Sequence, residues 1–281
     1  MTGLPLSTFT VLGASGYIGS RLVAHLQAQG HSVWSPARGA AEVFTRQLGH
    51  VIYCVGLTAD FRTRPFDTVD AHVGLLAEVL RRAQFHSLLY LSSTRVYMGA
   101  TRTDEDAPLA VLPGDLSYLY NLTKLTGESL CHACGRPGVR VARLSNVVGP
   151  GMDAASGNLV ADLLHQAQGG RIVLRSDPQS AKDYVHVDDL LDWLPRIALA
   201  GRAATYNVAS GRQTTHAQWL AWLQARTGCS VEVAGQAPLQ AFPPINVLRL
   251  QGEWGVAPRA VLADDLLPFP PSNDPVGVPP P

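Results

Sequence analysis

Cysteine is scarce in this chain: its 281 residues include only four. Secreted domains that rely on disulfides are rich in cysteine, so this scarcity favours a reducing, cytoplasmic setting. Cys131 and Cys134 are spaced as C-x-x-C, but a structural zinc site needs two further ligands, and only His132 lies close by in the sequence. We therefore expect no bound metal and interpret the two cysteines as small residues of a helix, with a zinc site as the alternative.

The chain also lacks a net charge and a long apolar run. It carries 22 basic and 22 acidic residues, so no overall field favours nucleic acid or an anionic membrane. No uninterrupted apolar stretch approaches the roughly 18 residues of a membrane span, and the first residues show no basic start followed by an apolar run. We expect neither a nucleic-acid partner nor a membrane partner. Hydrophobic residues make up 46% of the chain, which is enough for a large core.

Segments with the character of strands alternate with segments of helical periodicity. Strands are expected at 9–12, 32–37, 50–56, 87–93 and from 139 onward. Helices are expected from 18 to 29 and at 40–49, 65–84 and 118–134. Strands joined by helices form a parallel sheet that is covered on both faces. The predicted fold class is therefore α/β.

The pattern loosens after about residue 150, where glycine and proline become denser. We expect a first domain at 1–150, a smaller lobe at 151–268 that is interleaved with it, and a Pro-rich flexible tail at 269–281. The segment between the second and third strands is too short for another strand and helix. The sheet is therefore expected to lack one strand of a full doubly wound half.

A glycine-rich segment, GASGYIG, directly follows the first strand and opens a helix. Its three glycines suit a tight turn, a close approach of the backbone to a pyrophosphate, and close packing of helix on strand, while the helix N-terminus supplies N–H groups. The segment predicts a dinucleotide-binding loop, with a tight turn that binds no ligand as the alternative. The residues expected to contact the cofactor here are Gly13, Ser15, Gly16, Tyr17, Ile18 and Gly19.

The end of the second strand indicates which cofactor is bound. NAD-binding sites of this kind usually place an acidic residue there to hold the ribose 2′-hydroxyl. Here the segment is WSPAR, with no acid and with Arg38 at its end. A cation suits a 2′-phosphate, so NADP(H) is favoured over NAD(H); a solvated Arg38 beside bound NAD is the alternative.

The segment LSYLYNLTK contains two tyrosines and one lysine. Tyr120 and Lys124 are four residues apart and share one helix face, whereas Tyr118 has no lysine at that spacing. A free tyrosine has a pKa of about 10, and a nearby ammonium group favours the tyrosinate and lowers that pKa. Tyr120 and Lys124 are thus a candidate proton-transfer pair, with a boundary tyrosine and an exposed lysine as the alternative.

Six motifs resemble, in order, those of the extended short-chain dehydrogenase/reductase family, the group that modifies nucleotide sugars. They are GASGYIG, LSSTRVY, YNLTK, RLSNVVGPG, KDYVHVDDL and YNVASG. The resemblance runs from Phe9 to about Leu266. It implies a Rossmann-type doubly wound parallel sheet with a smaller C-terminal substrate lobe, so that 1–150 is an NAD(P)-binding Rossmann domain and 151–268 a substrate-binding lobe. It also implies an NAD(P)-dependent oxidoreductase or epimerase that acts by hydride transfer on a nucleotide sugar or a similar hydroxylated small molecule. Homodimers are usual in the family, so a homodimer is also expected.

The resemblance implies a role for individual residues. The catalytic set is Ser93, which holds the substrate oxygen, Tyr120, which transfers the proton, and Lys124, which also contacts the cofactor. Further cofactor contacts are implied at Cys54, Val55, Gly56 and Leu91. Substrate contacts are implied at Thr58, Thr94, Arg95, Asn146 and Lys182.

Several residues depart from the family's pattern. Thr94 and Arg95 stand where the dehydratases carry Asp-Glu, so dehydration is not expected; Arg95 is either an anion-binding residue or an ordinary surface arginine. His72 stands where the family has a helix-borne asparagine of the proton relay, and a satisfied helix histidine is the alternative. The short segment after Arg38 resembles the reductases and Lys182 the epimerases, so this choice stays open. A non-catalytic NADP(H)-sensing protein of the same superfamily is the alternative function, although such proteins tend to lose the Tyr/Lys pair.

Overall fold

The computed structural model describes residues 5–57 and 60–267. The chain divides into two compact units. Unit 1 comprises the described residues up to Val147 together with Lys182–Gln213 and Phe242–Arg259. Unit 2 comprises Val148–Ala181, Thr214–Ala241 and the described residues from Ala260 onward. The Pro-rich segment expected at 269–281 lies outside the described residues.

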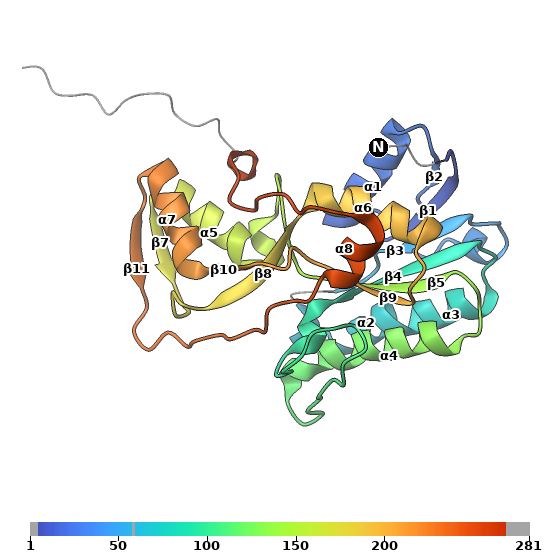
Figure 1. The fold of residues 1–281 in the computed structure, drawn as a ribbon, viewed down its shortest axis with the longest axis horizontal. Coiled ribbons are helices and arrows are strands. Elements are labelled where there is room, and N and C mark those ends of the chain that lie inside the picture. Colours follow the sequence, from blue (N-terminus) through green and yellow to red (C-terminus); the bar gives the residue numbers. More distant parts are fainter. Residues whose placement is uncertain (1–4, 58–59, 268–281) are drawn as a thin grey trace, which may run out of the picture. The chain divides into compact units, whose positions relative to one another are not determined.

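Unit 1 is built on a six-stranded sheet in the order β2-β1-β3-β4-β5-β9 (Figure 1). All neighbouring strands in this sheet are parallel. The strands are β1 Thr8–Leu12, β2 Ser32–Trp34, β3 His50–Tyr53, β4 Ser87–Ser93, β5 Val139–Leu144 and β9 Thr205–Val208. The prediction of an α/β, Rossmann-type parallel sheet is therefore confirmed.

The chain reverses its direction across the sheet at β1, because β2 pairs with one side of β1 and β3 with the other. Open α/β sheets bind ligands at the carboxyl ends of the strands beside such a switch point. Among the described residues, β2 is an edge strand of the sheet, and only a 3₁₀ turn, Ala41–Phe44, lies between β2 and β3. The expected absence of a further strand in this half of the sheet is thus confirmed for the described residues.

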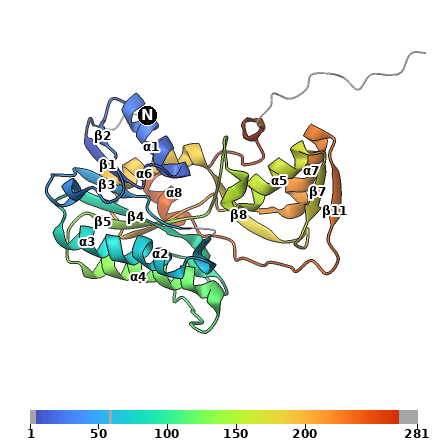
Figure 2. The same ribbon diagram turned by 180° about the vertical axis from the view of Figure 1, so that it is seen from behind.

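Both faces of the sheet are buried, as the apolar strands require. Phe9 and Leu89 point into a core cluster shared with α1 (Tyr17–Ala28), α6 (Val187–Ala200) and α8 (Leu248–Trp254). Leu12 and Leu88 point to the opposite face, because successive side chains of a strand alternate. That face is covered by α3 (Leu75–Arg82) and α4 (Leu119–Ala133), and Figures 1 and 2 show α1 and α6 on one side of the sheet and α3 and α4 on the other.

The helix expected at 65–84 is interrupted. It consists of α2 (Pro65–Val69), a π-helical turn (Asp70–Gly74) and α3. The hydroxyl groups of Tyr53 and Tyr90 donate hydrogen bonds to the carbonyl oxygens of Ala71 and His72, at 2.7 and 3.3 Å. These bonds satisfy carbonyl groups within the wider turn, and His72 is fully buried. Single π turns of this kind occur frequently at functional sites.

Two other expected elements are shorter than the sequence suggests. Strand β2 ends at Trp34, before Pro36, which has no N–H group to donate to a ladder. The helix expected at 40–49 is only the 3₁₀ turn Ala41–Phe44, which no side chain caps at its N-terminus. Further 3₁₀ turns are Asp60–Arg62, Thr94–Tyr97, Leu116–Tyr118, Ala154–Ser156 and Asp264–Leu266.

Unit 2 contains α5 (Leu159–Gln168) and α7 (His216–Thr227), which lie beside a parallel pair of strands in both ribbon views. The two strands are β7 (Arg171–Leu174) and β11 (Ser230–Val233). A three-stranded sheet in the order β10-β8-β6 consists of Gln213–Thr215, Ala181–His186 and Asn146–Val148, and most of its residues belong to unit 1. Within the described residues, no helix combines the length and apolar character of a membrane span.

Candidate active site

Two of the three loop glycines are required by packing within the chain itself. Gly13 has a φ of +84°, and a Cβ there would lie 2.8 Å from the carbonyl carbon of Cys54. A Cβ on Gly19 would lie 2.3 Å from the carbonyl oxygen of Gly13. Gly16 differs, because a Cβ there would meet only that same oxygen, at an ordinary 3.5 Å. Internal packing thus explains Gly13 and Gly19, whereas Gly16 leaves room for a ligand against the exposed backbone.

The start of α1 lies directly after this glycine turn. The helix begins at Tyr17, and the preceding Gly16 has no side chain to cap it. The first turn, which includes Ile18, contains no acidic residue. Ser15 and Gly16 are exposed. Free N–H groups and the positive end of the helix dipole suit a phosphate, so the loop fits the pyrophosphate of a dinucleotide.

The segment after β3 lies against both the glycine turn and the lysine. The backbone of Cys54 and Val55 borders Gly13, as the close approach above shows. A Cβ on Gly56 would meet the Nε2 atom of His72 at 3.0 Å and the Nζ atom of Lys124 at 3.3 Å. Burial raises the pKa of the Cys54 thiol to about 12, so this residue lines the site as an uncharged thiol.

Lys124 is buried on the inner face of α4. Its ammonium group donates a hydrogen bond of 2.8 Å to the carbonyl oxygen of Leu91 in β4. Burial lowers the pKa of Lys124 to about 7, and Glu128 and Cys54 oppose this only in part. The Nζ atom lies 5.8 Å from the centre of the Tyr120 ring. The spacing argument is therefore confirmed in that the two side chains lie near each other, and the alternative of an exposed lysine is wrong.

Tyr120 is 6% exposed. Its burial raises its pKa, while a hydrogen bond with Ser93 and the charge of Arg95 act in the opposite direction. Burial outweighs these two opposing groups, so the net shift of the Tyr120 pKa is upward. The Tyr120 ring packs against His72 and Phe61, with centroid distances of 5.3 and 5.6 Å.

Ser93 is the last residue of β4 and caps the 3₁₀ turn Thr94–Tyr97. Its hydroxyl oxygen accepts a hydrogen bond of 3.2 Å from the backbone N–H of Arg95. Thr94 is buried in that turn. The hydroxyl of Ser93 therefore reaches Tyr120 from the carboxyl end of a central strand, which is where open α/β sheets place reactive groups.

His72 uses both of its ring nitrogens within the protein. The Nε2 atom accepts a hydrogen bond of 3.2 Å from the backbone N–H of Leu57, and the Nδ1 atom lies 2.8 Å from the Thr123 hydroxyl. Because Nε2 accepts, Nδ1 carries the proton and donates it to Thr123. Burial, followed by the charge of Lys124, lowers the pKa of His72 to about 3. The histidine is thus neutral and satisfied, as the alternative interpretation held.

The residues expected to contact the substrate are partly engaged elsewhere. The Asn146 side chain donates to the carbonyl oxygen of Asp183 at 2.9 Å. The ammonium of Lys182 lies 5.3 Å from the centre of the Phe242 ring, and burial together with the charge of Arg95 lowers its pKa. Thr58 lies outside the described residues. Arg95 is half-buried, and its positive charge acts to lower the pKa of Tyr120.

The region after β2 holds a second cation that the sequence argument missed. Arg38 is exposed in the turn that follows the strand. Arg46 also belongs to this region, with its guanidinium 4.7 Å from the centre of the Trp34 ring. No local motif marks Arg46, because twelve residues separate it from the tryptophan on which it stacks.

The C-x-x-C pair lies at the end of α4. The thiol of Cys134 donates to the carbonyl oxygen of Cys131 at 3.2 Å, and all four cysteines are free thiols. Among the described residues, neither cysteine belongs to a group of three side chains that could share a metal ion. The pair therefore behaves as two small helical residues.

These features define a class of protein. A parallel sheet with a glycine turn at its switch point, followed by a serine, a tyrosine and a lysine converging on one strand end, is a dinucleotide-binding fold with a proton-transfer site. The sequence model of the NAD dependent epimerase/dehydratase family matches residues 9–209. The chain belongs to this family.

Individual relatives agree with the family assignment. The chain is similar to dTDP-4-dehydro-6-deoxy-D-allose reductase of Streptomyces sp., at 25% identity over 74% of this chain and 77% of the relative. The solved structure of MoeE5 in complex with UDP-glucose and NAD has a TM-score of 0.78 and 21% identity, and covers 92% of this chain and 97% of that one. RMD from Pseudomonas aeruginosa, complexed with NADPH, has a TM-score of 0.72 and 24% identity, and covers 92% and 96%. The structural likenesses show the fold.

Proposed function

We propose that this protein is an NAD(P)-dependent oxidoreductase or epimerase that acts by hydride transfer on a nucleotide sugar or a similar hydroxylated small molecule. The observation that carries the proposal is the convergence of Ser93, Tyr120 and Lys124 beside the glycine turn. The curated relative from Streptomyces is a reductase of a dTDP-linked sugar. MoeE5 was solved with a UDP-linked sugar and NAD.

The residues of the chain have distinct tasks in such a reaction. When bound, the nicotinamide would supply or accept the hydride. Tyr120 gives a proton to the substrate oxygen, or takes one from it, at its hydroxyl group, and Ser93 donates a hydrogen bond to the same oxygen. Lys124, with a pKa of about 7, is partly charged at neutral pH, and its charge favours the tyrosinate. Burial of Tyr120 keeps bulk water away from this proton transfer.

The experiment is a turnover measurement with Tyr120→Phe and Ser93→Ala, using UDP- and dTDP-linked sugars and their 4-keto forms. Loss of a positioned acid or base costs about 10²–10⁴ in rate, so Tyr120→Phe should lose turnover by this factor and still bind the cofactor. Tyr118→Phe is the matched control and should keep its turnover. Full turnover by Tyr120→Phe would show that another group transfers the proton. Tight cofactor binding by the wild-type protein without turnover of any sugar would favour a non-catalytic sensor.

The cofactor preference is a separate part of the proposal. We favour NADP(H), because no acid stands at the end of β2 and the exposed Arg38 follows it. Arg46 adds a second positive charge in this region. Neighbouring structures hold NAD in one case and NADPH in another, so relatives alone do not decide. The nicotinamide that copurifies, identified by mass, and a shift of preference toward NAD in Arg38→Glu would support this choice.

Dimerisation and location complete the proposal. We propose a homodimer through the helices 70–82 and 119–133, because large apolar side chains are exposed on the first of these, Leu75 at 38%, and on the helix before it, Phe66 at 84% and Val69 at 40%. Light scattering of the wild-type protein should give a dimer mass, and Phe66→Ser with Leu75→Glu should give a monomer. A monomer mass for the wild-type protein at micromolar concentration would contradict the proposed homodimer. The four free thiols support a reducing, cytoplasmic setting.

A further inference from the structure

Arg95 borders the reactive tyrosine, and two further cations, Arg62 and Lys182, lie close enough to Arg95 for their charges to interact with it. Among the side chains that the structure describes, Arg95 and Lys182 have no carboxylate within 4.0 Å, although many other arginines do. Arg62 lowers the pKa of Arg95, and Arg95 lowers that of Lys182, in each case after burial as the larger cause. Asp115 is the counter-charge that both arginines share, and it is exposed and engaged with Ser117. Positive charge next to Tyr120 is therefore largely unbalanced.

The two arginines meet at one aromatic ring. Phe61 is 3% exposed. The guanidinium carbon of Arg62 lies 4.4 Å from the centre of its ring, and that of Arg95 lies 5.7 Å away. The ring of Tyr120 packs on the same phenylalanine at 5.6 Å. Two planar cations and the proton-transfer tyrosine therefore border a single buried side chain.

Arg95 also has an unused donor. Its Nη2 atom donates to the carbonyl oxygen of Ser117 at 3.3 Å, but its Nε atom is buried and has no hydrogen-bond partner. An unsatisfied buried donor of this kind requires an explanation, such as an ion or ligand group that completes it. A carboxylate matches the donor fork of a guanidinium group.

The position of Arg95 restricts which part of the substrate it meets. Arg95 follows Ser93 by two residues, and its backbone N–H donates to the Ser93 hydroxyl oxygen. Ser93 and Tyr120 hold the reacting oxygen in the proposed function, so the side chain of Arg95 starts beside the reacting carbon. In a nucleotide sugar, the diphosphate is attached to the sugar ring on the side opposite this reacting carbon.

We propose that the substrate carries a carboxylate next to the reacting carbon, and that Arg95, with Arg62, binds it beside Tyr120. The substrate class is thus a nucleotide-linked uronic acid or a sugar acid of the same shape, rather than a neutral sugar. This inference rests on the proposed function, because it takes the site at Ser93 and Tyr120 to be the reactive one.

The test is a set of calorimetric titrations of the protein loaded with its nicotinamide cofactor. The ligands are UDP, UDP-glucose and UDP-glucuronic acid, with the dTDP-linked series beside them. The glucuronic acid form should bind at least tenfold more tightly than the glucose form. Arg95→Gln should remove most of this preference while it leaves the affinity for UDP and UDP-glucose unchanged, and Arg62→Gln should reduce the preference about threefold. Arg102→Gln, at an exposed arginine paired with Asp104, is the control and should keep it.

Each other outcome counts against the proposal. Equal affinity of the wild-type protein for the glucose and glucuronic acid forms would overturn it and leave the proposed function standing. An equal loss of UDP affinity in Arg95→Gln would show that Arg95 holds the diphosphate instead. If Arg95→Gln does not fold, the exposed Arg62→Gln variant decides. An unchanged preference of this variant for the glucuronic acid form over the glucose form would contradict a carboxylate site shared by the two arginines. If no nucleotide binds at all, the proposed function and this inference fall together.

Discussion

His72 and Thr123 join the π-helical turn to the helix that carries Tyr120 and Lys124, through a hydrogen bond of 2.8 Å between Nδ1 and Oγ1. The Thr123 hydroxyl in turn donates to the carbonyl oxygen of Tyr120 at 3.0 Å. On its other side, the imidazole accepts from the backbone N–H of Leu57. The neutral His72 ring thus connects the backbone at Leu57, after β3, to helix α4, which carries Tyr120 and Lys124.

The first prediction concerns this connection. His72→Phe keeps an aromatic ring but removes the acceptor of the Leu57 N–H group and the donor to the Thr123 hydroxyl, and a buried group left unsatisfied costs about 1–3 kcal/mol. We expect the free energy of unfolding to fall by an amount in that range in urea titrations. Thr123→Val should also lower it, because this change removes the bond from His72 and the bond to the carbonyl oxygen of Tyr120. A double-mutant cycle should give a non-zero coupling energy, and strict additivity would contradict the direct bond.

The same histidine predicts a dependence on acid pH. Its pKa is lowered to about 3 in the folded state and is about 6.5 in the unfolded chain, so the unfolded chain binds more protons between these values. The stability that His72 contributes is therefore present above pH 6.5 and is lost as the pH falls toward 3, by about 1.4 kcal/mol per pH unit. The difference in stability between wild type and His72→Phe should shrink on acidification. Thr123→Val, which keeps the buried imidazole, should retain the acid slope.

Lys124 predicts a dependence in the alkaline range. Its folded pKa of about 7 lies below the unfolded value of about 10.4. The unfolded chain again binds more protons between the two values, so this residue makes the protein more stable as the pH rises from 7 toward 10. The stability of the cofactor-free wild type, minus that of Lys124→Met, should rise by about 1.4 kcal/mol per pH unit in this window. A difference that stays flat from pH 7 to 9 would show that the ammonium is solvated.

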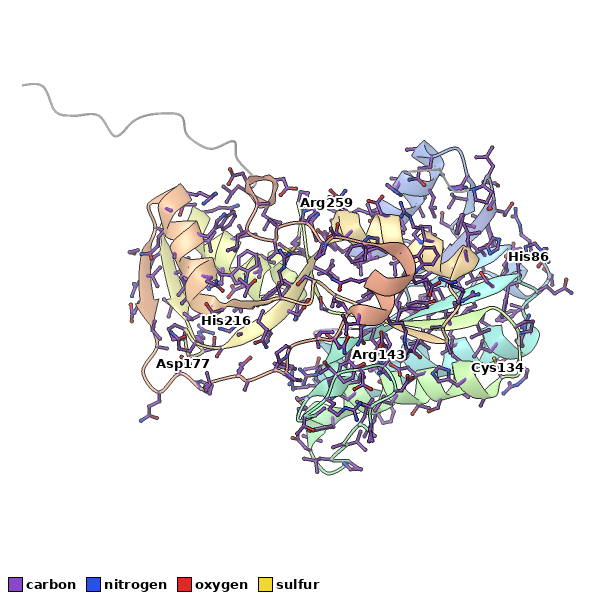
Figure 3. All side chains as sticks on the ribbon, in the orientation of Figure 1. His86, Cys134, Arg143, Asp177, His216 and Arg259 are labelled. Atoms are coloured by element: carbon purple, nitrogen blue, oxygen red, sulfur yellow. The ribbon has the colours of Figure 1, made fainter. Side chains whose placement is uncertain are left out.

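Arg143, which is labelled in Figure 3, forms a buried ion pair with Glu128. Their side chains are 6% and 4% exposed, and Nη2 of Arg143 lies 2.6 Å from Oε2 of Glu128. Arg143 also donates to the Tyr97 hydroxyl at 2.7 Å. Removal of one member of such a pair leaves an unpaired buried charge and costs about 3–5 kcal/mol. Arg143→Met should lose this amount in denaturant titrations, and Arg143→Met with Glu128→Met should lose less. If the double variant lost as much free energy of unfolding as the two single variants added together, the two residues would not be coupled.

A further prediction belongs to unit 2, where α7 begins with a capping box. The Thr215 side chain accepts from the N–H of Gln218, and the Gln218 side chain accepts from the N–H of Thr215. Loss of such a cap costs about 0.5–2 kcal/mol, so Thr215→Ala should unfold at a lower urea concentration. Thr215→Ser keeps the hydroxyl and should remain close to wild type. Because Thr215 takes no part in the site described above, turnover should be unchanged in both variants.

Local patterns in the sequence determined the elements and the first set of site residues. Gly13 and Gly19 follow a strand and open a helix, and Tyr120 and Lys124 lie one helical turn apart, so each signal is contained in a few residues of regular period. The buried, alternating strands likewise require helices on both faces of the sheet. These are the parts of the fold and site that a reader of the sequence can predict. The π-helical turn at Asp70–Gly74 escaped this reasoning, because its amino-acid pattern does not differ from that of an ordinary helix.

Only the tertiary structure decided the electrostatics and the long-range partners. Arg95 and Arg62 meet at Phe61, although Arg62 and Arg95 are separated by a strand and two helices along the chain. Lys124 finds the carbonyl oxygen of Leu91 on a neighbouring strand. Burial, opposed by Ser93 and Arg95, decides the direction of the Tyr120 pKa, because the free energy of burying a charge depends on everything packed around it and not on one neighbour four residues away.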